Sequence, residues 1–349
     1  MVLAMPLHGP DGRVLLGAGV VLKPSYIERL VRLGFTGAYI KDGVADDVPA
    51  DTPITEQTRM AAVAAVRQAF SELARDEAPL RADRLRAAVD SILDELLRRP
   101  SVTVGLSEIR SADDYTFAHS VDVAVMSIVC GMAMGLPRPK LSELGMAALL
   151  HDIGKVRIDR AILTKPAPLS EREAEDMKMH TVFGFEMLRG RVDISAVVAG
   201  VAYQHHERND GTGYPRGLRE PQIHPFAQVV AVVDVFDAMT SDRVYRRGIP
   251  IHQAAQFLER TKGKLFNTMA VERFLSRVSL YPTGSTVKLN TGEVAVVVRQ
   301  NTGHRSRPVV RVVANSSGRL LKRPIEVDLV MDTDRAIVGL ARWEPPVEP

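Results

Sequence analysis

The sequence has little cysteine, no long apolar run and no block of like charge. Its 349 residues include one cysteine, Cys130, so neither a disulfide framework nor a thiolate metal site can form within one chain. The first ten residues lack the basic and apolar pattern of a signal peptide, and no stretch of about 18 consecutive apolar residues occurs. From these absences we expect a cytoplasmic protein that is neither secreted nor inserted in a membrane.

The charge balance excludes one class of partner. The 45 Lys and Arg residues nearly match the 42 Asp and Glu residues, and no run of five like charges occurs. Non-specific binding to nucleic acid is therefore not expected. Apolar residues make up 46% of the chain and charged residues 25%, which is typical of globular proteins, and the length favours two or three domains.

The spacing of apolar residues divides the chain into four parts and predicts a mainly α protein. Residues 1–50 predict a small α+β unit, and residues 54–100 a helical connector with two amphipathic helices. Residues 101–280 form the largest domain, with helices expected near 115–134, 142–152, 170–189, 193–206 and 228–240. Residues 281–349 contain short Val-rich runs broken by Asn and Gly turns, which predict a small β-barrel or meander.

The chemistry begins with a histidine and an aspartate at the end of an apolar helix. In this pair, His151-Asp152, the imidazole can bind one metal ion, while the two carboxylate oxygens can bridge two ions. A lone His-Asp pair is more often an ordinary hydrogen-bonded pair. The interpretation as a metal site therefore depends on the rest of the helical domain.

A second motif makes the interpretation specific. Residues 205–215, with the sequence HHERNDGTGYP, join two adjacent histidines to a glycine turn. Together with His151-Asp152 and Lys155, this string resembles the two-part signature of the HD-GYP phosphodiesterases. The GYP motif, Gly213-Tyr214-Pro215, is the second of the two parts. Further residues between about 110 and 250 match family positions in the expected order, namely His119, His180 with Gly184, and Asp234.

The resemblance implies an all-α HD-type domain that holds two divalent metal ions, with Fe or Mn favoured. It assigns one ion to His119, His151, Asp152 and Asp234. It assigns the other ion to Asp152, His180, His205 and His206, so that Asp152 bridges the two. Some members of the family hold a third ion with a glutamate four residues before the first histidine. Tyr115 occupies that position here, so we expect two ions.

The resemblance also implies the reaction, in which a metal-activated hydroxide hydrolyses cyclic di-GMP to linear pGpG, GMP or both. Asp152 and Lys155 are the predicted catalytic residues, with Lys155 neutralising charge on the phosphate. The predicted substrate contacts are Lys155, Asp237, Arg243 and Arg246. Taken alone, Lys155 and Arg243 could equally be surface charges, and Asp237 could cap a helix.

Two alternatives remain open at this point. The chain could be an HD-superfamily hydrolase of another nucleotide, or an adaptor that binds cyclic di-GMP with little turnover. A diguanylate cyclase docked on the loop that carries the GYP motif, and a homodimer, are further partners that the resemblance leaves open. The glycine of that motif, Gly213, could serve only to form a backbone turn, with Tyr214 packed beneath it.

Overall fold

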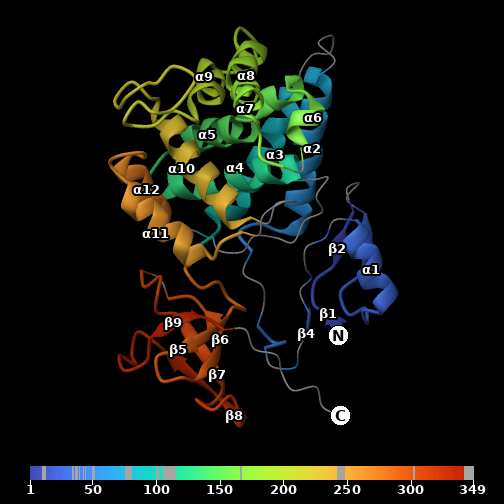
Figure 1. The fold of residues 1–349 in the computed structure, drawn as a ribbon, viewed down its shortest axis with the longest axis vertical. Coiled ribbons are helices and arrows are strands. Elements are labelled where there is room, and N and C mark those ends of the chain that lie inside the picture. Colours follow the sequence, from blue (N-terminus) through green and yellow to red (C-terminus); the bar gives the residue numbers. More distant parts are fainter. Residues whose placement is uncertain are drawn as a thin grey trace. The chain divides into compact units, whose positions relative to one another are not determined.

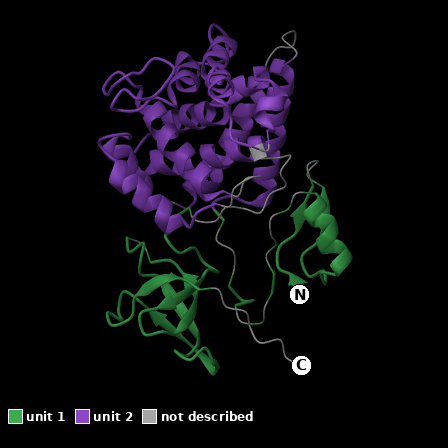
Figure 2. Cartoon of the chain, in the orientation of Figure 1, with its two compact units in different colours: residues 1–52, 103–111, 278–349 green, residues 53–102, 112–277 purple. Residues whose placement is uncertain are grey.

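A computed structural model of the chain forms two compact units (Figures 1 and 2). Unit 2 consists of residues 53–102 and 112–277, and unit 1 of residues 1–52, 103–111 and 278–349. The structure describes residues 1–9, 13–33, 35, 38, 40–41, 43, 45–48, 52–74, 81–99, 102–104, 115–165, 167–241, 248–301 and 303–341.

The named elements in the described part of unit 2 are all helices, joined by loops (Figure 1). Its elements are α2 (Glu56–Ala74), α3 (Ala82–Leu97), α4 (Tyr115–Ala133), α5 (Arg138–Leu150), the 3₁₀ helix η2 (Ile153–Arg157), α6 (Arg160–Leu163), α7 (Glu171–Lys178), α8 (His180–Leu188), α9 (Ala196–Gln204), α10 (Pro225–Thr240), α11 (Ile251–Thr261) and α12 (Thr268–Leu275).

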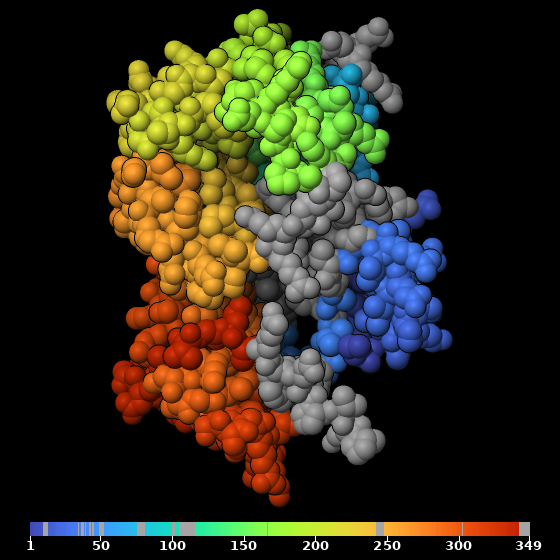
Figure 3. Space-filling model, in the orientation of Figure 1, coloured from blue at the N-terminus to red at the C-terminus, as the bar shows by residue number. Residues whose placement is uncertain are grey.

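Helices α4 and α5 form the centre of this unit. Almost every described residue of α4 from Ala118 to Cys130 is buried, and α5 is buried from Leu144 to Leu150. A helix that is apolar on all sides is stable in water only when other helices surround it. In the space-filling view, the visible face of unit 2 is formed largely by segments that follow α5, in lime green, yellow and orange (Figure 3). The polar residues His119, Asp122 and Ser127 of α4 therefore lie inside the unit.

Among the described residues, one helix is long and apolar enough to cross a membrane by length and composition. It is the segment Thr116–Ala133 of α4, of which 78% is buried inside the protein. A buried core helix passes the same test, and most of this segment of α4 is buried.

The predicted connector, residues 54–100, corresponds to α2 and α3, which belong to the same compact unit as the later helices. Arg59 of α2 forms a buried ion pair with Asp122 of α4. Removing one partner of a buried ion pair destabilises a protein by about 3–5 kcal/mol, because the other charge remains buried without compensation. This pair therefore fixes α2 against the helix that carries His119.

The single helix predicted near 170–189 is interrupted at Met179, where α7 ends and α8 begins. The start of α7 is as predicted. The Ser170 side chain accepts a hydrogen bond from the Glu173 backbone, and the Glu173 side chain accepts one from the Ser170 backbone, which together form a capping box. The interruption makes His180 the first residue of α8.

Unit 1 contains two separate small sheets and one helix near the N-terminus. Strand β1 (Val2–Leu3) pairs with β4 (Ile40–Lys41), and β2 (Leu7–His8) pairs with β3 (Val14–Leu16), both antiparallel. Helix α1 (Pro24–Arg32) contributes Leu30 to a core shared with Leu3, Leu7 and Phe35.

The C-terminal part of unit 1 is a five-stranded antiparallel sheet. Its strands are β5 (Thr286–Leu289), β6 (Val294–Arg299), β7 (Val309–Ala314), β8 (Leu320–Asp328) and β9 (Ile337–Leu340). Their order is β8-β7-β6-β5-β9, and among the described strands β8 and β9 remain unpaired edges. A closed barrel is therefore not confirmed. Strands β5 to β8 form a meander, and β9 pairs with β5 at the edge opposite β8.

Candidate metal centre

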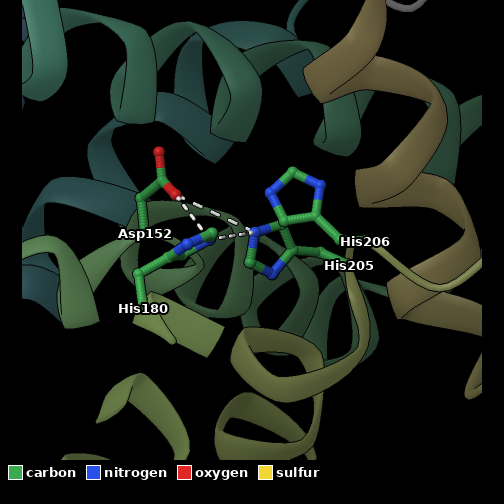
Figure 4. A group of neighbouring side chains, drawn as sticks. All are labelled: Asp152, His180, His205 and His206. Atoms are coloured by element: carbon green, nitrogen blue, oxygen red, sulfur yellow. Dashed lines mark hydrogen bonds and ion pairs between the residues drawn. The ribbon is translucent and has the colours of Figure 1, made fainter. Parts of the chain in front are cut away.

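Five segments of unit 2 bring the seven predicted metal ligands together. His119 comes from α4, His151 and Asp152 from the junction of α5 and η2, His180 from the start of α8, His205 and His206 from the end of α9, and Asp234 from α10. They form two groups, each with its ligand atoms within 4.8 Å of one another. The first group is His119, His151 and Asp234, and the second is Asp152, His180, His205 and His206 (Figure 4). All except His206 are buried.

Gly154 explains how Asp152 comes close to His180. A Cβ atom at Gly154 would lie 1.9 Å from the backbone oxygen of His180 and 2.5 Å from the backbone nitrogen of Gly184. Only glycine permits so close an approach of η2 to α8. Gly154 and Gly184 thus allow η2, which follows His151-Asp152, to pack directly against α8, which begins at His180.

Four of the five histidines predicted as ligands are held by a hydrogen bond from Nδ1. The backbone oxygens of Ala148, Met177 and Ala202 accept from His151 at 2.7 Å, from His180 at 2.6 Å and from His205 at 3.0 Å, respectively. The carboxylate Oδ2 of Asp237 accepts from His119 at 2.7 Å. When such a ring is neutral and Nδ1 carries its proton, the lone pair of Nε2 is available for a metal ion.

The two oxygens of Asp152 face different histidines. Oδ2 lies 3.8 Å from Nε2 of His119 and 3.3 Å from Nε2 of His151. Oδ1 lies 3.5 Å from Nε2 of His180 and 3.8 Å from Nε2 of His205, as the dashed lines in Figure 4 show. One carboxylate therefore connects both groups of ligands.

The local electrostatics keep most ligands in the protonation state that binds a metal. Burial lowers the pKa of His205 well below its ordinary value and that of His206 to about 3. Burial opposes ionisation of Asp152, but Lys155 and His151 hold its pKa well below the usual range. For His119, burial is outweighed by hydrogen bonds with Asp234 and Asp237, which raise its pKa to about 9.

An orphaned atom shows that the cluster fits a cation. Nε2 of His151 is fully buried and makes no hydrogen bond within the part of the chain that the structure describes. A buried polar atom without a partner costs about 1–3 kcal/mol, which a bound cation would remove. Imidazole nitrogens with carboxylate oxygens and no thiolate suit a divalent first-row metal. The buried cluster thus has the chemistry of a divalent metal site.

The predicted substrate contacts have different surroundings. Nζ of Lys155 lies 2.5 Å from Oδ2 of Asp152, and 28% of the Lys155 side chain is exposed. Asp237 is buried, and its carboxylate is hydrogen-bonded to His119 rather than directed to solvent. Arg243 and Arg246 lie outside the described residues. Tyr115 begins α4, and nothing of its side chain is described.

Sequence reasoning missed Glu207. Its carboxylate is buried and accepts backbone hydrogen bonds from Arg216 and Leu218, both at 2.8 Å. A glutamate in a polar loop is normally solvated, so the sequence carries no signal for this role. Its place directly after two predicted ligands is the only hint.

Comparisons with known proteins identify a family for the helical region and several similar sequences. Residues 103–268 match the HD domain family, and residues 286–342 match the KOW domain associated with the HD domain. A cyclic di-GMP phosphodiesterase of Pseudomonas aeruginosa is 37% identical over 253 residues, which are 72% of this chain and 61% of that protein. A cyclic di-GMP phosphodiesterase of Thermotoga maritima is 43% identical over 49% of this chain and 46% of that protein.

A third relative, 3'3'-cGAMP-specific phosphodiesterase 3 of Vibrio cholerae, is 34% identical over 48% of this chain and 36% of that protein. The chain thus spans less than two thirds of the length of these curated relatives.

Among solved structures, an HDG"Y"P protein of Bdellovibrio bacteriovorus has the same fold. Its TM-score is 0.52 at 17% identity, and the match covers 78% of this chain and 94% of that chain. The family match spans α4 to α11 and the start of α12, which include every segment that supplies a ligand. Residues 103–268 of this chain therefore belong to the HD domain family.

Proposed function

We propose that this chain is a metal-dependent phosphodiesterase that hydrolyses cyclic di-GMP to linear pGpG, GMP or both. The observation that carries the proposal is the placement of Asp152, whose two oxygens face two separate groups of histidine nitrogens. A carboxylate in this position can bridge two cations. The names of the relatives from Pseudomonas aeruginosa and Thermotoga maritima support the choice of substrate.

Two divalent cations, for which we propose Fe or Mn, would lower the pKa of a water molecule and neutralise phosphate oxygens. The protein's own contribution is to hold the ligands and to supply positive charge beside them. Lys155 is suited to this second task, because its ammonium group lies next to Asp152 while part of its side chain reaches solvent. It can donate to a phosphate oxygen and stabilise the negative charge that grows during in-line displacement.

Recognition of the rest of the substrate is assigned to arginines. Arg243 and Arg246 remain the residues that we expect to bind the second phosphate or a guanine edge, since a guanidinium fork matches both. Asp237 fits this task less well, because its carboxylate is buried against His119.

The proposal is tested on full-length protein purified without oxygen. Bound metal is measured by elemental analysis, and the products of cyclic di-GMP are separated by chromatography. We expect turnover that disappears in Asp152→Asn and survives in Asp176→Asn, which makes the same chemical change at an exposed position of α7. Tight binding of cyclic di-GMP to metal-loaded protein without product would overturn the proposal in favour of an adaptor.

A second candidate substrate is 3'3'-cGAMP, which the name of the Vibrio cholerae relative suggests. The two cyclic dinucleotides differ in one base, so the metal ligands cannot distinguish them. The comparison of kcat/KM for both substrates under the same conditions decides between them. Hydrolysis of a nucleoside triphosphate without cleavage of either cyclic dinucleotide would place the chain with other HD hydrolases.

A further inference from the structure

The loop that carries the GYP motif folds back on the metal ligands. This loop, residues 207–218 and hereafter the GYP loop, begins directly after His206. The backbone nitrogen of Tyr214 donates to the backbone oxygen of His206 at 3.3 Å. The ring of Tyr214 then stacks on the ring of His206, with centroids 4.7 Å apart and planes 27° apart.

His206 differs from the other four ligand histidines. Their Nδ1 atoms all donate to a carbonyl or carboxylate oxygen, which fixes the orientation of each ring. The ring of His206 makes no hydrogen bond to any residue that the structure describes, and its contacts are with the rings of His180, His205 and Tyr214. His206 is also the least buried of the predicted ligands. Something other than a hydrogen bond must hold its ring.

We propose that Tyr214 is a positioning residue that holds the imidazole of His206 in place as a metal ligand, and that the GYP loop exists to deliver it. The inference rests on the proposed function, since it concerns the same metal centre. Tyr214 also contacts the edge of His180, with centroids 6.5 Å apart, and Nζ of Lys178 lies 5.7 Å from the centroid of the Tyr214 ring. The ring is thus enclosed by two predicted ligands and a cation.

Two features of the loop serve this placement. A Cβ atom at Gly213 would lie 2.3 Å from the backbone nitrogen of Arg208 and 2.5 Å from the backbone oxygen of His206, so only glycine allows the chain to return this closely. The buried carboxylate of Glu207 accepts hydrogen bonds from the backbone of Arg216 and Leu218, just beyond the motif. Glu207 therefore closes the loop around Tyr214.

The loop is also fixed to the turn between α11 and α12. The carboxylate of Glu220, just after the loop, accepts hydrogen bonds from Asn209 at 2.5 Å and from Asn267 at 2.6 Å. The guanidinium of Arg208 lies 4.7 Å from the ring centroid of Phe266. These contacts, made by residues that flank the motif, hold the GYP loop against other parts of unit 2. They favour an internal role over the docking of a cyclase on Tyr214.

The test is a titration of metal-stripped, full-length protein with Mn²⁺, followed by calorimetry. We expect Tyr214→Leu to weaken Mn²⁺ binding about fivefold, since ring stacking contributes about 1 kcal/mol. Tyr214→Phe keeps the ring and binds Mn²⁺ as the wild type does. In a His206→Ala background, Tyr214→Leu has no further effect, because the ring that it positions is absent.

Equal Mn²⁺ affinity in the wild type and Tyr214→Leu overturns the inference, as does an equal loss with and without His206. If Tyr214→Leu does not fold by circular dichroism, Glu207→Gln replaces it, since it opens the loop while keeping the ring, and the same dependence on His206 is required. Wild-type protein that binds Mn²⁺ but does not cleave cyclic di-GMP overturns the proposed function alone.

Discussion

At the scale of single residues, Asp237 is placed to orient a predicted metal ligand without being a ligand itself. It lies one turn of α10 after Asp234, and both carboxylates face the imidazole of His119. Asp234 is 3.1 Å from Nε2, and Asp237 is 2.7 Å from Nδ1. The first can share a metal with His119, while the second fixes the tautomer and the orientation of the ring.

This arrangement makes Asp237→Asn informative. We expect the substitution to lower metal affinity about tenfold, because the charged acceptor that orients His119 is lost. The KM for cyclic di-GMP, measured with saturating metal, stays at the wild-type value. Asp176→Asn serves as the matched control. A raised KM with unchanged metal affinity would instead support the direct substrate contact that the family resemblance implied.

At the scale of elements, the approach of η2 to α8 is the contact that brings Asp152 to His180. We expect Gly154→Ala to destabilise unit 2 by about 1–3 kcal/mol, since the added methyl group forces apart two backbones that cannot adjust separately. Chemical denaturation measures this loss.

The control for this substitution is Gly200→Ala. Gly200 lies in α9, and a Cβ atom added there would meet no described atom within 4 Å, so alanine should be neutral or stabilising by up to about 1 kcal/mol. Equal stability of Gly154→Ala and the wild type would mean that η2 and α8 separate without cost.

A second contact between elements depends on pH. The carboxylate of Glu95 on α3 accepts hydrogen bonds from the backbone nitrogen of Thr55 at 2.6 Å and from the side chains of Thr55 and Thr58, at the start of α2. Partial burial opposes its ionisation, but these bonds lower its pKa below the ordinary 4.5. Because the folded pKa is depressed, the stabilisation is complete above 4.5 and is lost as the pH falls through the folded value.

We therefore expect Glu95→Gln to lower the free energy of unfolding at pH 7 by roughly 0.5 kcal/mol, a small value because water screens this partly exposed group. The difference from the wild type narrows as the pH falls below 4.5, where the wild-type carboxylate also becomes protonated. Urea denaturation at several pH values measures it. A difference that is independent of pH would assign the effect to packing.

Features that depend on local residue spacing can be predicted from this sequence, while features that depend on packing between distant segments cannot. The cores of α4, α5 and α10 follow from apolar residues in helical spacing. Four of the seven predicted ligands lie in the two local motifs, and the family resemblance implies the other three. The interruption at Met179 and the bond between His119 and Asp237 do not follow, because each depends on packing between distant segments. His119 and Asp237 are 118 residues apart. The prediction of a barrel rests on turn spacing alone, which does not determine whether the edge strands pair.

At the scale of the whole molecule, the chemistry belongs to one unit. All seven predicted ligands, Lys155 and the GYP loop lie in unit 2. The C-terminal sheet has its own core, which includes Val287, Leu289, Val297, Val310 and Leu329. Two units with separate cores can unfold in separate steps.

Metal removal should therefore affect one unit of the chain and spare the other. Binding to the folded state alone stabilises by about 3 kcal/mol at 100 times the Kd, which for a unit of this size raises Tm by roughly 5–10 °C. We expect scanning calorimetry of full-length protein to show a transition that rises by this amount with Mn²⁺ and falls on addition of a chelator. A second transition, from the C-terminal sheet, does not move.

The assignment of these transitions can be checked with one variant. Asp152→Asn removes the carboxylate that faces both groups of histidines, so the response of the first transition to Mn²⁺ should be lost while the second stays in place. Asp176→Asn should keep the full response, since its side chain is exposed and belongs to neither group of ligands. If Mn²⁺ raised both transitions equally, the stability of the C-terminal sheet would depend on the metal centre, and the separation of the molecule into a catalytic unit and an independent sheet would be wrong.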